Sequence, residues 1–214
     1  MFVAKTRFMN FLAHIYLSGN NKQLITGNFI GDHIKGKNFL KYPGRIREGI
    51  ILHRRIDTFT DTHPLAREVR LLFRHEYRLY SGVVTDLVFD HYLAKNWHCF
   101  SATSLKHFTH KVHRVLLEHY FYLPPRVKGF LPILIKNRRL ESYAQLEGIQ
   151  ESMKIMSRYT SLPDKTDLAI EIMKLESSFI ESRFHPFMEE LIAFVEQETG
   201  LTIKDTACAP NNPK

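Results

Sequence analysis

The chain has 214 residues, of which 44% are hydrophobic and 16 are phenylalanine, so it is long enough for one domain with a sizeable core. Lysine and arginine outnumber aspartate and glutamate by 30 to 22, and the resulting formal charge of +8 favours anionic partners. No apolar run reaches the roughly 18 residues of a membrane span, which excludes a transmembrane helix. Cys99 and Cys208 form no CxxC pair, which excludes a disulfide scaffold. Together these features predict a cytoplasmic protein.

The N-terminal segment imitates a signal peptide, because Lys5 and Arg7 precede an apolar stretch. His14 interrupts that stretch and no small-x-small cleavage site follows, so we interpret residues 10–17 as the first helix of the fold. The expected division of the chain is an N-terminal extension (residues 1–8), a helical domain (residues 9–200) and a C-terminal tail (residues 201–214).

Apolar residues recur at helical spacing in almost every segment, and no segment alternates as a half-buried strand would. The sequence therefore predicts an all-α, single-domain helical bundle. The expected helices span residues 10–17, 22–34, 44–59, 64–79, 82–97, 104–121, 125–137, 141–159 and 165–198. Asp61 and Thr62 before Pro64 resemble a helix N-cap. Pro186 predicts a kink or a division of the last helix.

Two glycines lie one turn apart on the second predicted helix, at Gly27 and Gly31. They permit close approach of a neighbouring helix or a phosphate. Asp32 directly follows the second glycine, where a close-packed bundle would present it to a central site. His14 on the first helix could join that site, although a single histidine among aromatic neighbours is more often a core residue with its own hydrogen bond.

The third predicted helix carries His53 and Asp57 at i, i+4 spacing, so both project from one side, among isoleucines of its apolar face. An imidazole nitrogen and a carboxylate oxygen one turn apart suit a transition-metal ion. The alternative is an ordinary buried hydrogen bond between the two. Asp61, one turn further along, either joins such a site or only caps the next helix.

The fifth predicted helix places Asp90 inside an arc of apolar residues, with Asp86 at the border of the arc one turn earlier and His91 on its other side. An unpaired carboxylate on a buried face is costly, and two of them one turn apart also repel each other. One or two divalent cations would remove both penalties. The alternative is that arginine side chains pair with both acids.

Arginines gather near the same segments, and Arg54 and Arg55 directly follow His53. A second row on the fourth predicted helix comprises Arg67, Arg70, Arg74 and Arg78. Bidentate guanidinium groups suit phosphate or carboxylate ligands. The alternative is a charged helix face in contact with solvent. The expected surface charges further along the chain are Arg126, Lys128, Arg138 and Arg139.

Four blocks in the first half of the chain resemble the bacterial acyl carrier protein phosphodiesterases: MNFLAHIYLS, GNFIGDHIKG, GIILHRRIDTFTDTHP and SGVVTDLVFDHYLAKNW. The resemblance runs in order from Met9 to Trp97, and more loosely to about Phe194. It implies hydrolysis of holo-acyl carrier protein, an acidic protein substrate, to the apo form with release of 4′-phosphopantetheine. It also implies a helical fold related to the HD-domain phosphohydrolases and a divalent metal, Mn²⁺ or Mg²⁺. Neither nucleic acid nor membrane is an expected partner.

The resemblance and the buried acids together predict the site residues. The expected metal ligands are Asp32, His53, Asp57, Asp86 and Asp90; the expected catalytic or orienting groups are Asp32, Asp61 and His91; Arg54 and Arg55 are expected to hold the phosphopantetheine phosphate. The chain departs from the HD pattern, because Asp32-His33 and Asp90-His91 stand where a His-Asp pair would. The alternatives are an HD-like hydrolase of nucleotides or small phosphate esters, which needs no carrier protein, and a basic nucleic-acid-binding helical protein, against which the buried acids argue.

Overall fold

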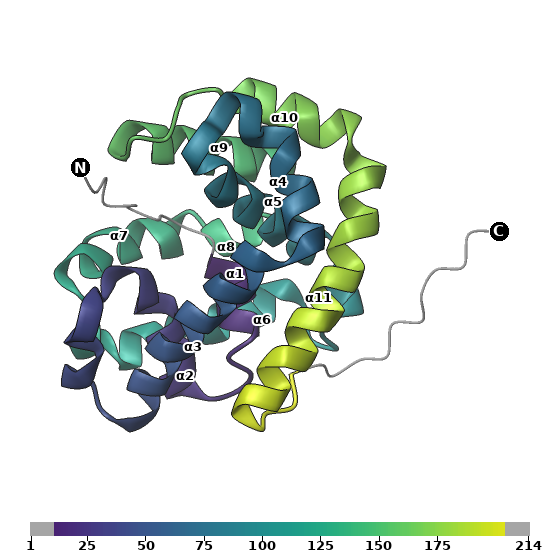
Figure 1. Cartoon of the computed structure of the whole chain (residues 1–214). Coiled ribbons are helices and arrows are strands. Elements are labelled where there is room, and N and C mark those ends of the chain that lie inside the picture. Colours follow the sequence, from purple (N-terminus) through teal and green to yellow (C-terminus); the bar gives the residue numbers. More distant parts are fainter. Residues whose placement is uncertain (1–10, 204–214) are drawn as a thin grey trace.

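The computed structural model describes residues 11–203, and in this range the chain consists of α-helices joined by short 3₁₀ turns and loops, with no strand (Figure 1). The prediction of an all-α domain is therefore confirmed. The predicted N-terminal extension and residues 204–214 of the predicted tail lie outside the described residues.

The described part of the chain contains eleven α-helices. They are α1 (Phe11–Tyr16), α2 (Lys22–Ile30), α3 (Gly44–Thr62), α4 (Pro64–Tyr77), α5 (Ser81–Lys95), α6 (Leu105–Glu118), α7 (Pro125–Lys136), α8 (Arg139–Ser142), α9 (Leu146–Tyr159), α10 (Thr166–Leu175) and α11 (Ser177–Thr199). A 3₁₀ helix, η1 (Gly31–His33), continues α2, and a second, η2 (Gly36–Lys41), follows it. The sequence did not predict η2.

Two of the predicted helices are each divided in the structure. The range 141–159 begins inside α8 and contains all of α9. The range 165–198 divides at Glu176 into α10 and α11. Pro186 therefore does not mark the division, because it lies inside α11. Phe184 and Phe187 on either side of it are buried, so core packing holds the helix together despite the missing backbone N–H.

The predicted cap before α4 is also wrong. Helix α3 continues through Asp61 to Thr62, and the cap of α4 is His63, whose Nδ1 accepts a hydrogen bond from the backbone N–H of Leu65 at 3.3 Å. An imidazole nitrogen thus takes the place that the sequence pattern gave to a carboxylate or a hydroxyl group.

Helix α5 lies in the centre of the bundle, and every residue from Leu87 to Ala94 is buried. It packs against α1, α4, α9 and α11. The long helix α11 runs along one side of the molecule, where it contacts α3, α4 and α5 (Figure 1). No helix in the described range is both long and apolar enough to cross a bilayer.

Glycines set the closest helix–helix contact of the fold, between α2 and α3. A Cβ on Gly27 would overlap the Ile46 carbonyl group, and a Cβ on Gly49 would overlap the Leu24 carbonyl oxygen. The two backbones therefore touch where the sequence predicted a close approach at Gly27. A Cβ on Gly31 would overlap the His53 side chain, so this glycine makes room for one imidazole of the site described below.

The first residues of the predicted C-terminal tail belong to the fold. Ile203 is buried, and its backbone N–H donates a hydrogen bond to Glu196 Oε1 at 2.7 Å. The backbone N–H of Leu201 donates to Thr199 Oγ1. Residues 201–203 therefore fold back onto the end of α11 instead of forming part of a loose tail.

Candidate metal centre

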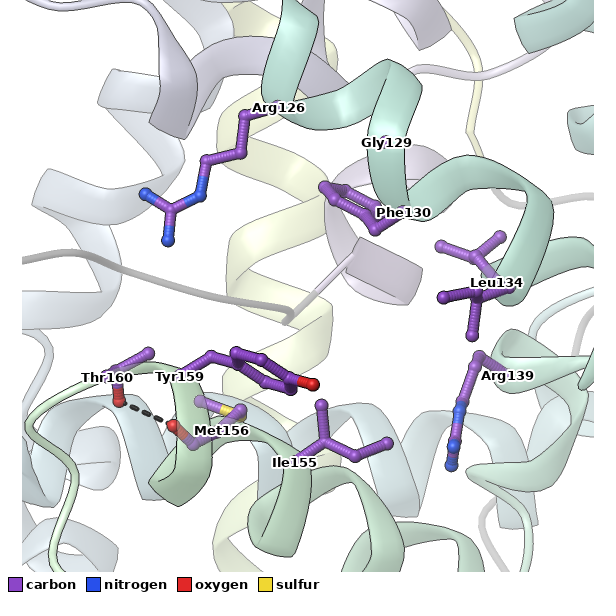
Figure 2. Close-up of a pocket in the computed structure, with 10 residues that line it drawn as sticks. Arg126, Gly129, Phe130, Leu134, Arg139, Ile155, Met156, Tyr159 and Thr160 are labelled. Carbon is purple, nitrogen blue, oxygen red and sulfur yellow. Dashed lines mark hydrogen bonds between the residues drawn. The ribbon is translucent and has the colours of Figure 1, made fainter.

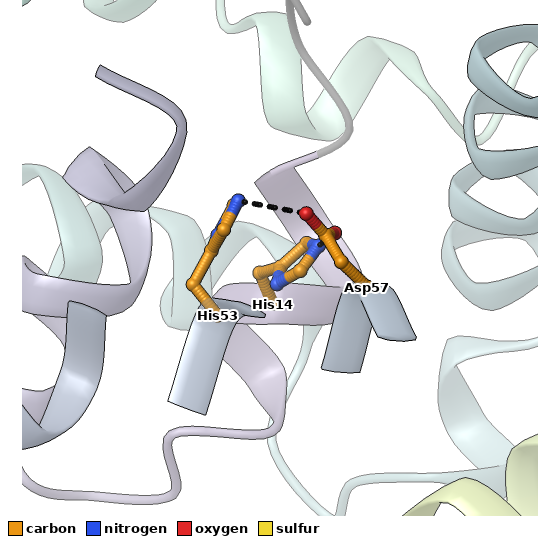
Figure 3. A group of neighbouring side chains, drawn as sticks. All are labelled: His14, His53 and Asp57. Atoms are coloured by element: carbon orange, nitrogen blue, oxygen red, sulfur yellow. Dashed lines mark ion pairs between the residues drawn. The ribbon is translucent and has the colours of Figure 1, made fainter. Parts of the chain in front are cut away.

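Three side chains from two helices converge near the middle of the bundle: His14 on α1, and His53 and Asp57 on α3. Their potential ligand atoms all lie within 4.8 Å of one another, and Figure 3 shows them pointing toward a common point. Nε2 of His14 lies 3.4 Å from one oxygen of Asp57, and Nε2 of His53 lies 3.6 Å from the other. The two imidazole rings stack with centroids 4.1 Å apart. The i, i+4 pair predicted on the third helix therefore forms the core of the cluster.

Asn28 on α2 orients both imidazoles. Its Nδ2 donates to the carbonyl oxygen of His14 and to Ser18 Oγ, so its Oδ1 faces His14 Nδ1 at 3.0 Å and accepts from it. The backbone oxygen of Asn28 accepts from His53 Nδ1 at 2.8 Å. In each neutral ring the lone pair is thereby placed on Nε2, the nitrogen that faces Asp57. Hydrogen bonds of this kind fix the ring orientation of metal-ligating histidines.

Asp32, on η1, adds a second carboxylate. Its Oδ1 lies 3.3 Å from His53 Nε2, and its side chain is 9% exposed. Burial alone would raise the pKa of Asp32, but the neighbouring His53 outweighs that effect and lowers it. Asp32 therefore stays ionised beside the cluster, at the edge of His53 that Gly31 leaves open.

His53 Nε2 is the atom that most directly indicates a cation. It is buried, and despite its two carboxylate neighbours it reaches hydrogen-bond geometry with no group in the described range. Burial by itself would lower the pKa of His53, but the Asp32 and Asp57 carboxylates outweigh burial and raise it. A proton on Nε2 would compensate the negative charge of the two carboxylates, and so would a metal cation bound in place of that proton. Two imidazole nitrogens with one or two carboxylates form a donor set that suits a divalent transition metal.

Asp90 is buried, as predicted, but backbone groups satisfy it. Its two carboxylate oxygens accept hydrogen bonds from the backbone N–H groups of Leu12 and Ala13, at 3.0 and 2.8 Å. Burial raises the pKa of Asp90 to about 7, and the two N–H groups limit the rise. The argument that this acid requires a metal is therefore wrong, because the first turn of α1 already supplies donors. Asp90 instead fixes the helix that carries His14.

The remaining predicted acids and histidine lie outside this group of three. Asp61 pairs with Arg70 at 3.1 Å near the end of α3. Asp86 is half-buried on α5. His91 Nδ1 donates to the carbonyl oxygen of Tyr143 at 2.8 Å, and burial lowers the pKa of His91. His91 thus holds α5 to the segment between α8 and α9. The catalytic roles of His91 and Asp61 stay predictions, and so does the metal-ligand role of Asp86.

Arg54 and Arg55 are both engaged within the fold. Arg54 donates to the carbonyl oxygens of Ile34 and Gly36, at 2.7 and 2.8 Å, and its guanidinium lies over the ring of Phe39. Arg55 forms an ion pair with Glu198 on α11. These contacts hold the loop after Asp32 and the end of α11, so the predicted phosphate-binding role of the two arginines receives no support from their geometry.

The other arginines differ in how far their side chains are exposed to solvent. Arg67, Arg74 and Arg78 are exposed, whereas Arg70 is half-buried and paired with Asp61. Arg139, predicted as a surface charge, is 3% exposed and donates to Glu151 at 2.5 Å. That prediction is wrong because the short helix α8 turns this side chain inward, against α9.

The predicted ligand set did not include His14, and Asn28 was not predicted at all. The signal for His14 was its position as the one histidine in the apolar first helix. Asn28 gave no comparable signal, because its role depends on two helices that meet only in the folded chain.

The chain is similar to one family of known proteins. A family model described as acyl carrier protein phosphodiesterase matches residues 9–191. A protein of that name from Photorhabdus laumondii is 31% identical over 188 residues, 85% of this chain and 94% of the relative. One from Yersinia pestis is 31% identical over 189 residues, 87% of this chain and 93% of the relative. No solved structure matches, so the likeness to HD-domain phosphohydrolases stays a prediction.

Proposed function

The chain belongs to the acyl carrier protein phosphodiesterase family, whose members are phosphoric diester hydrolases, and from this premise we propose that it hydrolyses holo-acyl carrier protein in the cytoplasm. The bond that breaks would join the carrier-protein serine oxygen to the phosphorus of 4′-phosphopantetheine. The products would be apo-carrier protein and free 4′-phosphopantetheine. The positive charge of +8 supports an acidic protein as the substrate.

The observation that carries the proposal is the cluster of His14, His53 and Asp57 with Asp32 beside it. We propose that His14, His53 and Asp57 hold the divalent metal and that Asp32 lies next to it. A divalent cation would polarise a phosphate oxygen of the diester and promote attack by water. Two imidazole nitrogens favour Mn²⁺ over Mg²⁺, because Mg²⁺ prefers an all-oxygen shell. The proposed ligands do not include Asp90, because its carboxylate already accepts hydrogen bonds from backbone N–H groups of α1.

Each protein group in the cluster has a separate task. Asn28 holds both imidazoles with Nε2 toward the centre. Asp57 faces both Nε2 atoms, one with each oxygen, and supplies negative charge where the cation would bind. Asp32 lies next to His53 at the end of η1. A carboxylate that is not fully committed to a metal can accept a proton from attacking water, and Asp32 is the candidate for that role.

The test is incubation with purified holo-acyl carrier protein after removal of bound metal. With Mn²⁺ the carrier protein should lose the mass of one phosphopantetheine group, and with chelator it should not. Added salt should raise the apparent KM, because it screens the encounter of a basic enzyme with an acidic substrate. Mass spectrometry of the carrier protein over time gives both results. Absence of mass loss with Mn²⁺, Mg²⁺ and Co²⁺, together with hydrolysis of a small phosphodiester, would favour a small phosphate-ester hydrolase.

A further inference from the structure

A pocket of about 320 Å³ lies between α7 and α9. Figure 2 shows Phe130 and Leu134 from α7 facing Ile155 and Met156 from α9 across it. This volume is at the lower end of the range of small-ligand sites, which is roughly 300–1,000 Å³. The lining is mainly apolar. At its rim two large hydrophobic side chains are exposed to solvent, Ile133 by 55% and Tyr159 by 74%.

The polar groups of the pocket are few. Arg126 and Arg139 lie at opposite sides of it (Figure 2). Arg139 is already paired with Glu151, and Thr160 Oγ1 donates to the carbonyl oxygen of Met156. The pocket therefore offers little to a nucleotide base or a sugar, each of which needs several hydrogen-bonding partners. Its chemistry fits a flexible apolar chain that enters beside a cationic side chain.

The pocket adjoins the candidate metal centre. The ring of Phe130 lies 5.9 Å, centroid to centroid, from the ring of His33. His33 directly follows Asp32, whose carboxylate is 3.3 Å from His53. Phe130 also packs against Phe11, on the helix that carries His14. One aromatic side chain thus forms part of the wall between the cluster and the pocket.

We propose that this pocket binds the acyl chain of an acylated carrier protein. The inference rests on the proposed function, because the substrate phosphate must lie at the cluster for its arm to reach the pocket. The pantetheine arm is a flexible chain that ends in a thiol, and an acyl group on that thiol extends it with methylene groups. The apolar lining would take this extension, so the protein would act on acylated carrier protein as well as on the holo form.

Gly129 on α7 offers a way to fill the pocket with little disturbance of the fold. It lines the pocket (Figure 2). Apart from its chain neighbours and the backbone of its own helix, a Cβ placed on it would have no atom of the described residues within 4 Å. Gly129→Phe therefore places a ring in the open space. Gly129→Ala is the control, because it also raises the helix propensity at this position but does not fill the pocket.

The measurement is kcat/KM for holo-, butyryl- and octanoyl-carrier protein with Mn²⁺. Each buried methylene contributes up to about fourfold in affinity. We therefore expect wild type and Gly129→Ala to prefer the octanoyl form over the holo form by at least about tenfold. Gly129→Phe should retain wild-type turnover of the holo form and lose the preference. Equal kcat/KM for all three substrates in wild type, or an unchanged preference in Gly129→Phe, would overturn the inference.

A second measurement separates this inference from the proposed function. Calorimetry compares S-octanoyl-4′-phosphopantetheine with unacylated 4′-phosphopantetheine as ligands of the metal-loaded protein. Wild type should bind the acylated compound at least about tenfold more tightly, and Gly129→Phe should bind the two alike. This result would support the pocket even if no carrier protein were hydrolysed. Equal affinities in wild type would refute the pocket even if holo-carrier protein were turned over.

Discussion

Replacing Asp57 with Asn should lower kcat/KM for holo-carrier protein by more than about a hundredfold and leave the metal-free protein folded. Loss of an outer-shell partner of a metal ligand already costs about 10–100-fold, and Asp57 is placed to be a ligand itself. Its two oxygens face His14 Nε2 and His53 Nε2 at 3.4 and 3.6 Å. An amide has the same shape but lacks the negative charge that attracts the cation.

Thermal melting distinguishes lost metal binding from lost folding. Wild type should gain about 2.7 kcal/mol of stability at a metal concentration of 100 times Kd. Asp57→Asn should gain much less and should melt like wild type in chelator. Glu48→Gln is the matched control, because Glu48 is an exposed acid on the same helix, with 58% of its side chain accessible. A metal-induced gain in Asp57→Asn equal to that of wild type would remove Asp57 from the site.

Replacing Asp90 with Ala should have the opposite outcome, with large destabilisation and a retained metal response. The substitution leaves the backbone N–H groups of Leu12 and Ala13 buried without an acceptor. Each stranded N–H costs about 1–3 kcal/mol, so near pH 5 the free energy of unfolding should fall by about 2–6 kcal/mol. The variant that remains folded should still be stabilised by Mn²⁺. Loss of the metal-induced gain at full stability would make Asp90 a ligand after all.

The loss of stability caused by Asp90→Ala should depend on pH, and the pKa of Asp90 gives the direction of this dependence. Burial raises the pKa of Asp90 from its ordinary value of 3.8 to about 7 in the folded protein. The native state therefore holds this proton more tightly than the unfolded state. The stability that results is fully present below the ordinary pKa and is lost as the pH rises through the folded pKa. The cost of Asp90→Ala, measured by urea unfolding, should consequently shrink between about pH 4 and pH 7.

Local sequence patterns were sufficient to predict the all-helical fold and part of the site. Helical periodicity predicted that His53 and Asp57 share one face, and the structure shows them in one cluster. Gly27 predicted a close helix contact, which α3 makes. These predictions succeeded because each depends on residues within a few positions of one another along the chain.

The rest depended on contacts between distant segments. Asp90 lies on an apolar helical face, as its position in the sequence indicated, but the groups that satisfy it come from α1, 77 and 78 positions away. Arg54 and Arg55 look like phosphate ligands in the sequence, whereas loop carbonyl oxygens and Glu198 engage them in the fold. A sequence pattern shows that a buried charge needs a partner, and only the tertiary structure shows which partner it has.

The most direct test of the metal centre is a crystal of the protein grown with Mn²⁺, measured by anomalous diffraction at the manganese edge. The proposed centre predicts a strong anomalous peak about 2–2.5 Å from His14 Nε2, His53 Nε2 and an oxygen of Asp57. The peak should disappear in crystals of Asp57→Asn. A manganese peak at Asp86 or Asp90 with none at the two histidines would contradict it.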